Sequence, residues 1–407
     1  MKGNKKDNRP NLPRVERIQL DVKNVKLRWI VVALLICLGT GAIGWGVYRA
    51  LKIEPGWQTV EVASDLPTTG MDFVLRYDFS GTGGAAPNHL RALNQVYRQA
   101  SEEAYTLFGS PEGGGLGKLG SSPNTPVTLE PKVYQALTLF DETTAPYLFL
   151  APAMAEYERV FLCEDDGEAA RFDPRKNSET KQWLAELAAF VSNPEHIRLE
   201  LLGSNQAVLH VSQAYLAFAE ENGLETFLEL GWMKNAFAAD YLAEQLQENG
   251  FTNGYLVSYD GFTRNLDNRE LDYTQSVFER RGNDLFAAGN LHYTGPMSFV
   301  FLRDYPIGEQ DRWHYYAYEN GDVLMSYLSP EDAMPKASIS NLLGYSREKG
   351  CAQVLLELLP VFIQDQFHPE QFPEDTQAVW ADQNGIHWTG PELKRLDSQE
   401  DLAYQIP

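Results

Sequence analysis

The segment from Leu228 to Arg264 reads LELGWMKNAFAADYLAEQLQENGFTNGYLVSYDGFTR. It predicts a short apolar strand, a turn at Gly231 and then about four turns of helix with apolar side chains on one stripe. Asn249-Gly250 ends that helix, because glycine readily adopts the left-handed conformation of a helix cap. A second strand follows Asn253-Gly254 and ends at Asp260-Gly261. This order of strand, glycine, helix and strand can aim backbone N–H groups at a phosphate.

The N-terminus has the composition of a membrane anchor. Residues 29–48 (WIVVALLICLGTGAIGWGVY) are 20 uncharged residues in succession, which is long enough to cross a bilayer. Residues 1–28 hold nine Lys/Arg against three Asp/Glu, and this positive charge predicts that the N-terminus stays in the cytoplasm. A cleavable signal peptide is the alternative, but the run is long for one and no small-x-small site follows before Arg49. We therefore expect an uncleaved single-pass anchor in the cell membrane, with the main domain outside the cytoplasm.

The part of the chain after residue 28 is strongly acidic. It has 25 basic and 53 acidic residues, a net charge of −28. Such a surface repels nucleic acid and anionic lipid, so neither is an expected partner. We expect a basic cytoplasmic tail over 1–28, the transmembrane helix over 29–48, a stalk over 49–58, one domain over 59–365 and a peripheral acidic tail over 366–407.

Motifs for zinc or hydrolase chemistry are absent from the sequence. The seven histidines form no H-E-x-x-H or other close pair, and there is no G-x-S-x-G elbow. Residues 115–120 match G-x-G-x-x-G, but a loop rather than a strand precedes them, so we interpret this stretch as a surface loop. An outside location permits a disulfide between Cys163 and Cys351, and two cysteines leave that pairing open.

The remaining pattern predicts an α+β domain with mixed or antiparallel sheets and flanking helices. The expected helices are 89–108, 131–142, 183–191, 335–343 and 352–358. The expected strands are 71–77, the hairpin 197–212 that turns at 203–205, 298–303, 312–318 and 322–327.

Taken in order, these segments resemble the ApbE family, the FAD:protein FMN transferases. The central pattern of that family is D-L-G-G-I-A-K-G-Y-A-x-D, a helix and then G-G-D-x-R. Leu230-Gly231, Asp240 and Arg264 match this pattern. The differences are Glu229 for the first Asp, Trp232 for the second glycine, Asn235 for the lysine, Ala236 for the next glycine and Asp260-Gly261-Phe262 for G-G-D.

Three further motifs follow the family order. Thr69-Gly70-Met71 takes the place of M-G-T before the first strand, and residues 126–137 resemble P-V-x-V-S-x-E-L-x-x-L-L. Residues 314–321 resemble H-I-I-D-P-x-T-G, with His314 kept and Ala317 in place of the Asp. Lys234 lies one position before the family lysine and could reach a phosphate from there.

The last motif, A-D-A-x-x-T, holds magnesium in the family through its Asp and Thr. Aligned with this chain, Lys336 falls on the Asp and Ser340 on the Thr. Because a lysine cannot be a Mg²⁺ ligand, Lys336 is either a fixed cation that binds pyrophosphate without metal or a residue of an inactive site. Glu331 and Asp332 could supply carboxylates if the alignment shifts by a few residues.

The resemblance implies an ApbE-type (T-fold-like) domain that uses FAD and Mg²⁺. The family reaction breaks the FAD pyrophosphate, moves FMN onto a Ser/Thr hydroxyl of a target protein and releases AMP. Three hypotheses follow for this chain: an active flavin transferase, a non-catalytic relative that binds flavin or a protein, and an unrelated acidic interaction domain. The implied site residues are His314 and Lys234 for catalysis, Gly231, Asp240, Asp260, Gly261 and Arg264 for the cofactor, and Ser340 for the metal.

Overall fold

The predicted cytoplasmic tail and transmembrane helix lie outside the residues that the structure describes. Within the described residues, no helix combines the length and the apolar character that a membrane span requires. The residues from Pro55 to Pro407 form one compact unit. The computed structural model describes residues 56–60, 73–82, 86–110, 113–390 and 396–405.

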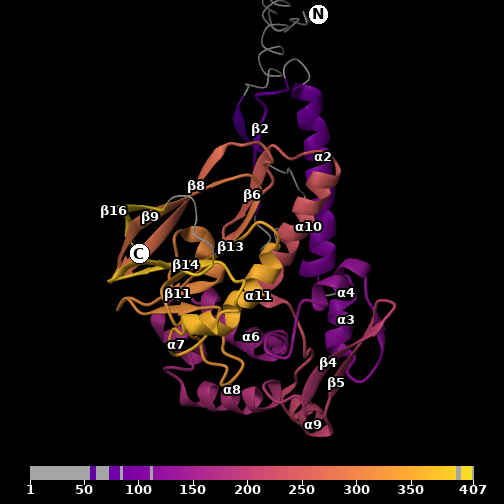
Figure 1. Cartoon of the computed structure of the whole chain (residues 1–407). Helices are drawn as coiled ribbons and strands as arrows, with labels where there is room; N and C mark the ends of the chain where they lie inside the picture. The colour runs from indigo at the N-terminus through magenta and orange to yellow at the C-terminus, as the bar shows by residue number, and fades with distance from the viewer. Residues whose placement is uncertain (1–55, 61–72, 83–85, 111–112, 391–395, 406–407) are drawn as a thin grey trace, which may run out of the picture. The chain divides into compact units, whose positions relative to one another are not determined.

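An eight-stranded antiparallel sheet forms the centre of this unit (Figure 1). Its helices and neighbouring smaller sheets confirm the expected α+β class. The sheet joins strands from both ends of the unit, since β1 pairs with β2 at one edge and β14 with β15 at the other. The strand order is β1 (Trp57–Val60), β2 (Phe73–Asp78), β6 (Gly254–Ser258), β7 (Phe262–Asn265), β10 (Met297–Arg303), β13 (Asn341–Ser346), β14 (Ala378–Asp382) and β15 (Gly385–Trp388).

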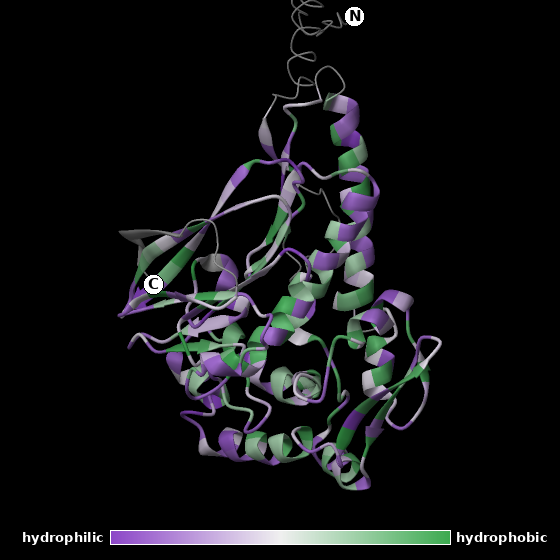
Figure 2. Cartoon of the chain, in the orientation of Figure 1, coloured by the Kyte–Doolittle hydropathy of each residue, from purple (hydrophilic) through white to green (hydrophobic). Residues whose placement is uncertain are grey.

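Three helices cover one face of the sheet: α2 (Ala86–Ala104), α10 (Lys234–Glu248) and α11 (Cys351–Phe362). Hydrophilic and hydrophobic residues alternate along α2 in Figure 2, as expected for a helix with one solvent-facing side. Helix α11 lies very close to β13, because a Cβ on Gly344 would come within 2.6 Å of Leu358. This close packing fixes the helix layer that carries the start of α10.

A three-stranded sheet covers part of the opposite face. It has the order β16 (Leu396–Gln405), β9 (Asp284–Thr294) and β8 (Asp272–Arg281). Val277, Leu291 and Tyr293 from this sheet form one apolar core with Phe299 and Tyr345 of the central sheet. Burial of this kind contributes about 25 cal/mol per Å² of apolar surface, so the two sheets stabilise each other.

A mainly helical region connects α2 to α10. Asn177 and Ser212 cap two of its helices by accepting hydrogen bonds from the first backbone N–H groups. The expected hairpin is confirmed, with Ser204 and Asn205 at positive φ in its turn. The elements are a π-helical turn η2 (Tyr105–Gly109), α3 (Leu116–Ser121), β3 (Val127–Thr128), α4 (Pro131–Leu137), α5 (Ala145–Leu148), α6 (Ala151–Tyr157), η3 (Glu158–Leu162), α7 (Asp166–Phe172), α8 (Ser178–Val191), β4 (Ile197–Gly203), β5 (Gln206–Val211) and α9 (Gln213–Asn222).

The remaining short elements follow the central strands. The expected pair of strands around Gly321 is confirmed but shorter, as β11 (Tyr315–Ala317) and β12 (Val323–Met325). A 3₁₀ helix, η5 (Glu309–Trp313), occupies the first residues of the expected strand 312–318. Another 3₁₀ helix is η6 (Pro369–Gln371).

Two predictions in the second half are wrong. The expected helix over 335–343 is a loop that leads into strand β13, whose six residues are all buried. A strand buried on both faces loses the alternating pattern, and an apolar run of this length does not separate strand from helix. The stretch after residue 365 is not peripheral throughout, because β14 pairs with β13 in the central sheet.

Two predictions for segments that precede α10 also need correction. Residues 115–120 are not a plain surface loop, since most of them form α3. Gly120 is required there, because a Cβ would come within 2.6 Å of the Leu228 carbonyl oxygen. The apolar run 228–230 forms no strand and is held instead by a hydrogen bond from Glu229 N to Leu148 O at 3.1 Å. Cys163 and Cys351 are free thiols, which settles the open question of their pairing.

Candidate functional site

A cleft of about 1190 Å³ lies where the helical region meets the start of α10. Its walls come from α3, η3, the segment 225–234 and the end of η5 together with His314. Three of the predicted site residues line it together: Gly231, Lys234 and His314. Sites of this size accommodate drug-sized or larger ligands, so the cleft is the main candidate for ligand binding.

The segment before α10 positions the first two of these residues. A short 3₁₀ turn, η4 (Gly231–Met233), opens directly into α10. Gly231 has φ +53° and open space around its Cβ position, so the chain turns there without a side chain entering the cleft. Lys234 is the first residue of α10, and its own backbone N–H already donates a hydrogen bond to the carbonyl oxygen of Gly231 in η4.

Lys234 is a cation without a bonded partner in the described part of the chain. Its half-buried side chain makes no hydrogen bond and no ion pair within 4 Å to a described residue. Two carboxylates of the cleft, Glu158 and Glu229, nevertheless interact with it electrostatically. An unpaired ammonium at a helix N-terminus is well suited to bind a phosphate group.

His314 reaches the cleft from the opposite wall. It follows η5, whose Asp311 accepts hydrogen bonds from Ile307 N at 2.5 Å and from Gly308 N at 3.2 Å. Arg303 holds the same carboxylate through an ion pair of 2.6 Å, with both side chains buried. The turn that presents His314 is therefore rigid, because breaking a buried ion pair is costly.

Asp260 lies on the turn between β6 and β7, close to His314. Asn235 donates a hydrogen bond of 2.6 Å from Nδ2 to Asp260 Oδ2, so the residue that replaces the family lysine still binds this turn. Burial raises the pKa of Asp260 and lowers the pKa of His314, while attraction between the two groups opposes both shifts. A carboxylate next to a neutral imidazole can stabilise the imidazole when it takes up a proton.

Gly261, next to Asp260, lines a second and smaller pocket of about 550 Å³. Tyr255, Tyr273 and Tyr293 form much of its wall, and the buried pair of Arg303 and Asp311 closes it near η5. Residues of η5 line both cavities. Gly261 lines the smaller one, and Asp260 lines neither but contacts Asn235 behind the larger cleft.

Asp240 and Arg264 lie elsewhere, at the N-terminus of α11. Asp240 accepts hydrogen bonds from Cys351 N at 2.7 Å and Ala352 N at 2.9 Å. It also forms a 3.1 Å ion pair with Arg264, which donates to Ser298. These contacts give the two residues a role in capping α11 and joining it to α10 and β7.

The residues aligned with the family magnesium ligands do not fit a metal. Lys336 Nζ is bound by Asp332 at 2.8 Å and by Asp365 at 3.2 Å. Ser340 donates a hydrogen bond to Asp304, which already pairs with Arg280. Across the described ranges there is no group of three His, Cys, Asp or Glu side chains arranged to hold an ion.

Several residues of the cleft were not predicted from the sequence. Glu158 begins η3, far from any motif, and no pattern in the sequence brings it to Lys234. Arg312, Trp313 and Leu162 also line the cleft, and the last two side chains are 50% and 64% exposed. Only the tertiary arrangement of η3, η5 and α10 brings these side chains together.

Comparisons with known proteins find similarity in structure and not in sequence. No family model matches the chain, and no curated protein matches it. The structure is similar to the flavin transferase ApbE from Vibrio cholerae, with a TM-score of 0.47 and 11% identity over 82% of this chain and 97% of that one. It is also similar to the ApbE protein from Thermotoga maritima, with a TM-score of 0.55 and 11% identity over 82% of this chain and 97% of that one. The likeness to the T. maritima protein shows that this chain has the ApbE fold, as the order of its motifs predicted.

Proposed function

We propose that this chain is a membrane-anchored flavin-binding protein that holds FAD in the Lys234 cleft. In this proposal residues 29–48 cross the cell membrane once, the N-terminus lies in the cytoplasm and the ApbE-like domain lies outside. The net negative charge of the domain repels nucleic acid, so we expect none among its partners. Lys234 binds the diphosphate, and Trp232 and Trp313 offer aromatic surfaces to the rings.

The observation that carries this proposal is the contrast between two lysines. Lys234 is unpaired among the described residues and lines a cleft of about 1190 Å³. Lys336, the other candidate for a phosphate, is already bound by Asp332 and Asp365. A cation is available for a dinucleotide in the cleft, whereas the aligned metal position has no set of oxygen ligands. This supports flavin binding more strongly than metal-dependent transfer.

We expect Lys234→Met to weaken FAD binding by about tenfold, because a hydrogen bond to a charged group contributes on the order of 1.5 kcal/mol. Quenching of flavin fluorescence, titrated with the purified full-length chain, measures this change. Lys336→Met is the control and should leave the affinity unchanged, since its ammonium is held by carboxylates outside the cleft. Equal losses in both variants, or no binding by the unmodified chain, would contradict the proposal.

The pair of Asp260 and His314 favours a second function, transfer of FMN to a protein. A neutral His314 could accept the proton of an acceptor Ser/Thr hydroxyl while its oxygen bonds to the FMN phosphorus and the bond to AMP breaks. Asp260 would stabilise the protonated imidazole. This function is tested by incubating the chain with FAD, magnesium and a target protein that carries the family's acceptor motif. Covalent flavin fluorescence on a denaturing gel would support transfer, and retained but non-covalent FAD would support binding alone.

A further inference from the structure

The smaller pocket, of about 550 Å³, is built on one face of the central sheet. Alternate residues of a strand point to the same face. Strand β7 therefore directs Thr263 into the pocket and its neighbour Arg264 the opposite way, toward Asp240 of α10. Strands β6 and β10, on either side of β7, also line the pocket, and residues 273–275 of β8 form another part of its wall. The pocket thus lies on the face of the sheet opposite α10.

Aromatic rings form much of the surface of this pocket. Tyr273 and Tyr293 stack with their ring centroids 5.5 Å apart, and Tyr255 meets Tyr273 edge to face at 6.4 Å. The hydroxyls of the stacked pair are held in place, since Tyr273 donates to Asp267 and Tyr293 accepts from Asn265. Neither of these partners lines the pocket. The fixed ring surfaces, rather than the phenol oxygens, are therefore what the two tyrosines offer to a ligand.

A buried guanidinium supplies a hydrogen-bond donor to the pocket. Arg303 lines the pocket although its side chain is only 3% exposed. Its Nε donates to Tyr305 O at 3.1 Å, and its Nη2 donates to Asp311 Oδ1 at 2.6 Å and to Tyr259 O at 3.3 Å. Its Nη1 makes no hydrogen bond to a described residue, so this nitrogen can bind an oxygen atom of a ligand.

Uncharged polar side chains complete the lining. Thr263 Oγ1 and the amide of Gln310 make no hydrogen bond to another residue that the structure describes. The amide of Gln275 makes only a long contact, at 3.5 Å, with Ser276 O. Among the described residues that line the pocket, the charged ones are Arg303 and Asp311, which neutralise each other. An ionised ligand would meet no opposite charge here, so the pocket favours an uncharged one.

We propose that this pocket is a binding site for a neutral saccharide. The C–H groups of a sugar ring pack against aromatic faces such as those of Tyr255 and Tyr273, and its hydroxyls both donate and accept hydrogen bonds. They therefore satisfy Thr263, the two amides and Nη1 of Arg303 together. A purely aromatic ligand would leave these polar groups without partners, which is unfavourable in a buried site.

The saccharide site is distinct from the Lys234 cleft. The two cavities share no lining residue, and the cleft contains charged side chains that this pocket lacks. The volume of about 550 Å³ lies within the range of small-molecule sites and suits a mono- or disaccharide. Binding of a saccharide does not depend on whether the larger cleft binds FAD, so the two assignments can fail separately.

Saturation-transfer NMR and isothermal titration of the purified full-length chain test the proposal with four neutral disaccharides: maltose, cellobiose, lactose and diacetylchitobiose. We expect at least one of them to bind with a Kd of about 1 mM or below. FAD should not displace it, and Lys234→Met should bind it as tightly as the unmodified chain does. No binding of any of the four at tens of millimolar overturns the saccharide site. Displacement of the disaccharide by FAD assigns it to the larger cleft and overturns the proposal as well.

Two substitutions locate the ligand. Tyr255→Leu keeps an apolar side chain but removes the flat ring, and it should weaken binding by about five- to tenfold. Thr263→Val keeps the shape of the side chain and removes the unpaired hydroxyl, and it should weaken binding by about three- to tenfold. Tyr134→Leu is the control, because Tyr134 is a half-buried tyrosine of α4 that lines neither cavity.

Urea unfolding of each variant identifies any loss of binding that comes from a loss of folded protein. Unchanged affinity in both Tyr255→Leu and Thr263→Val overturns the assignment of the saccharide to this pocket. Equal losses in these variants and in Tyr134→Leu overturn it too, because the effect would then not be specific to the residues that line the pocket.

Discussion

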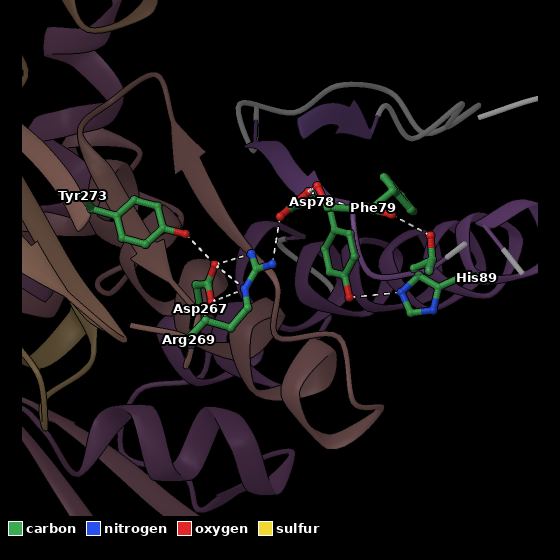
Figure 3. Close-up of polar contacts among 9 residues, drawn as sticks. Asp78, Phe79, His89, Asp267, Arg269 and Tyr273 are labelled. Carbon is green, nitrogen blue, oxygen red and sulfur yellow. Dashed lines mark hydrogen bonds and ion pairs between the residues drawn. The ribbon is translucent and has the colours of Figure 1, made fainter. Parts of the chain in front are cut away.

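Replacing Arg269 by methionine is expected to destabilise the folded chain by about 3 kcal/mol, the cost of leaving buried carboxylates without their cation. Arg269 bridges two acids from distant parts of the chain, with Asp78 Oδ2 at 2.8 Å and Asp267 Oδ2 at 2.6 Å. Figure 3 shows these contacts, together with the hydroxyl of Tyr273 that donates to Asp267 at 2.5 Å. Asp267 is fully buried and Asp78 nearly so.

Unfolding in urea, followed by tryptophan fluorescence, measures this loss. Arg76→Met is the control on the same strand as Asp78, because Arg76 is exposed and its guanidinium bonds only to the hydroxyl of Thr59 among the described contacts. We expect a change below about 0.5 kcal/mol for that variant. Similar losses in the two variants would show that the bridge is not needed for stability.

The same bridge gives a pH dependence with a definite sign. Burial alone would raise the pKa of Asp78 and of Asp267, but hydrogen bonds outweigh it and hold both below the usual value. For Asp78 these bonds come from Ser80 and Arg269, and for Asp267 from Arg269 and Tyr273. A lowered pKa stabilises the fold above the pKa of the unfolded chain, about 4 for an Asp, and this contribution is lost as the pH falls through the folded value. Arg269→Met should therefore lose less stability in acid than the unmodified chain.

Gly261→Ala is expected to cost about 3 kcal/mol, the upper end for a residue held in an unfavourable backbone conformation. Gly261 has φ +105°, and a Cβ there would come within 2.3 Å of the carbonyl oxygen of Phe301. The backbone cannot move away easily, because Phe301 N donates to Gly261 O at 2.9 Å. Any shift would also move Asp260 away from Asn235, so FAD binding should weaken along with stability.

A comparison with Gly250→Ala separates the cost of the left-handed backbone conformation from the cost of steric overlap between a new Cβ and its neighbours. Gly250 also has a positive φ, +78°, but nothing lies within 4 Å of its Cβ position. We expect this variant to lose about 1 kcal/mol, the cost of the left-handed conformation alone. Urea unfolding of both variants gives the comparison, and equal losses would mean that the contact with Phe301 relaxes without cost.

The central segment was predictable because its signals are local. The apolar stripe of α10, the Asn249-Gly250 end and the turn before β6 each depend on residues that are neighbours in sequence. The ApbE-type fold followed from the order of such segments. By contrast, the wrong helix at 335–343 covers a loop and only the first residues of the fully buried strand β13, where burial on both faces removes the periodicity that identifies a strand.

Some residues of the candidate site could likewise be predicted from local motifs, and others could not. Lys234, Gly231 and His314 were predicted from motifs, and the structure brings them to one cleft. The sequence could not show that Asp240 and Arg264 pair at the start of α11, because their contacts are with residues about 110 and 34 positions away. Glu158 was not predicted at all, since only the fold brings η3 and the start of α10 to the same cleft.

The central sheet also has a consequence for the synthesis of the protein. Its first strand begins at Trp57, but the strand that covers β13 begins only at Ala378. A chain that stops before this point leaves β13 with a free edge, and a buried apolar strand with an open edge readily pairs with other chains. Incomplete products of translation should therefore aggregate or be degraded rather than persist as partly functional domains. The central sheet is therefore complete only after the ribosome has passed residue 378.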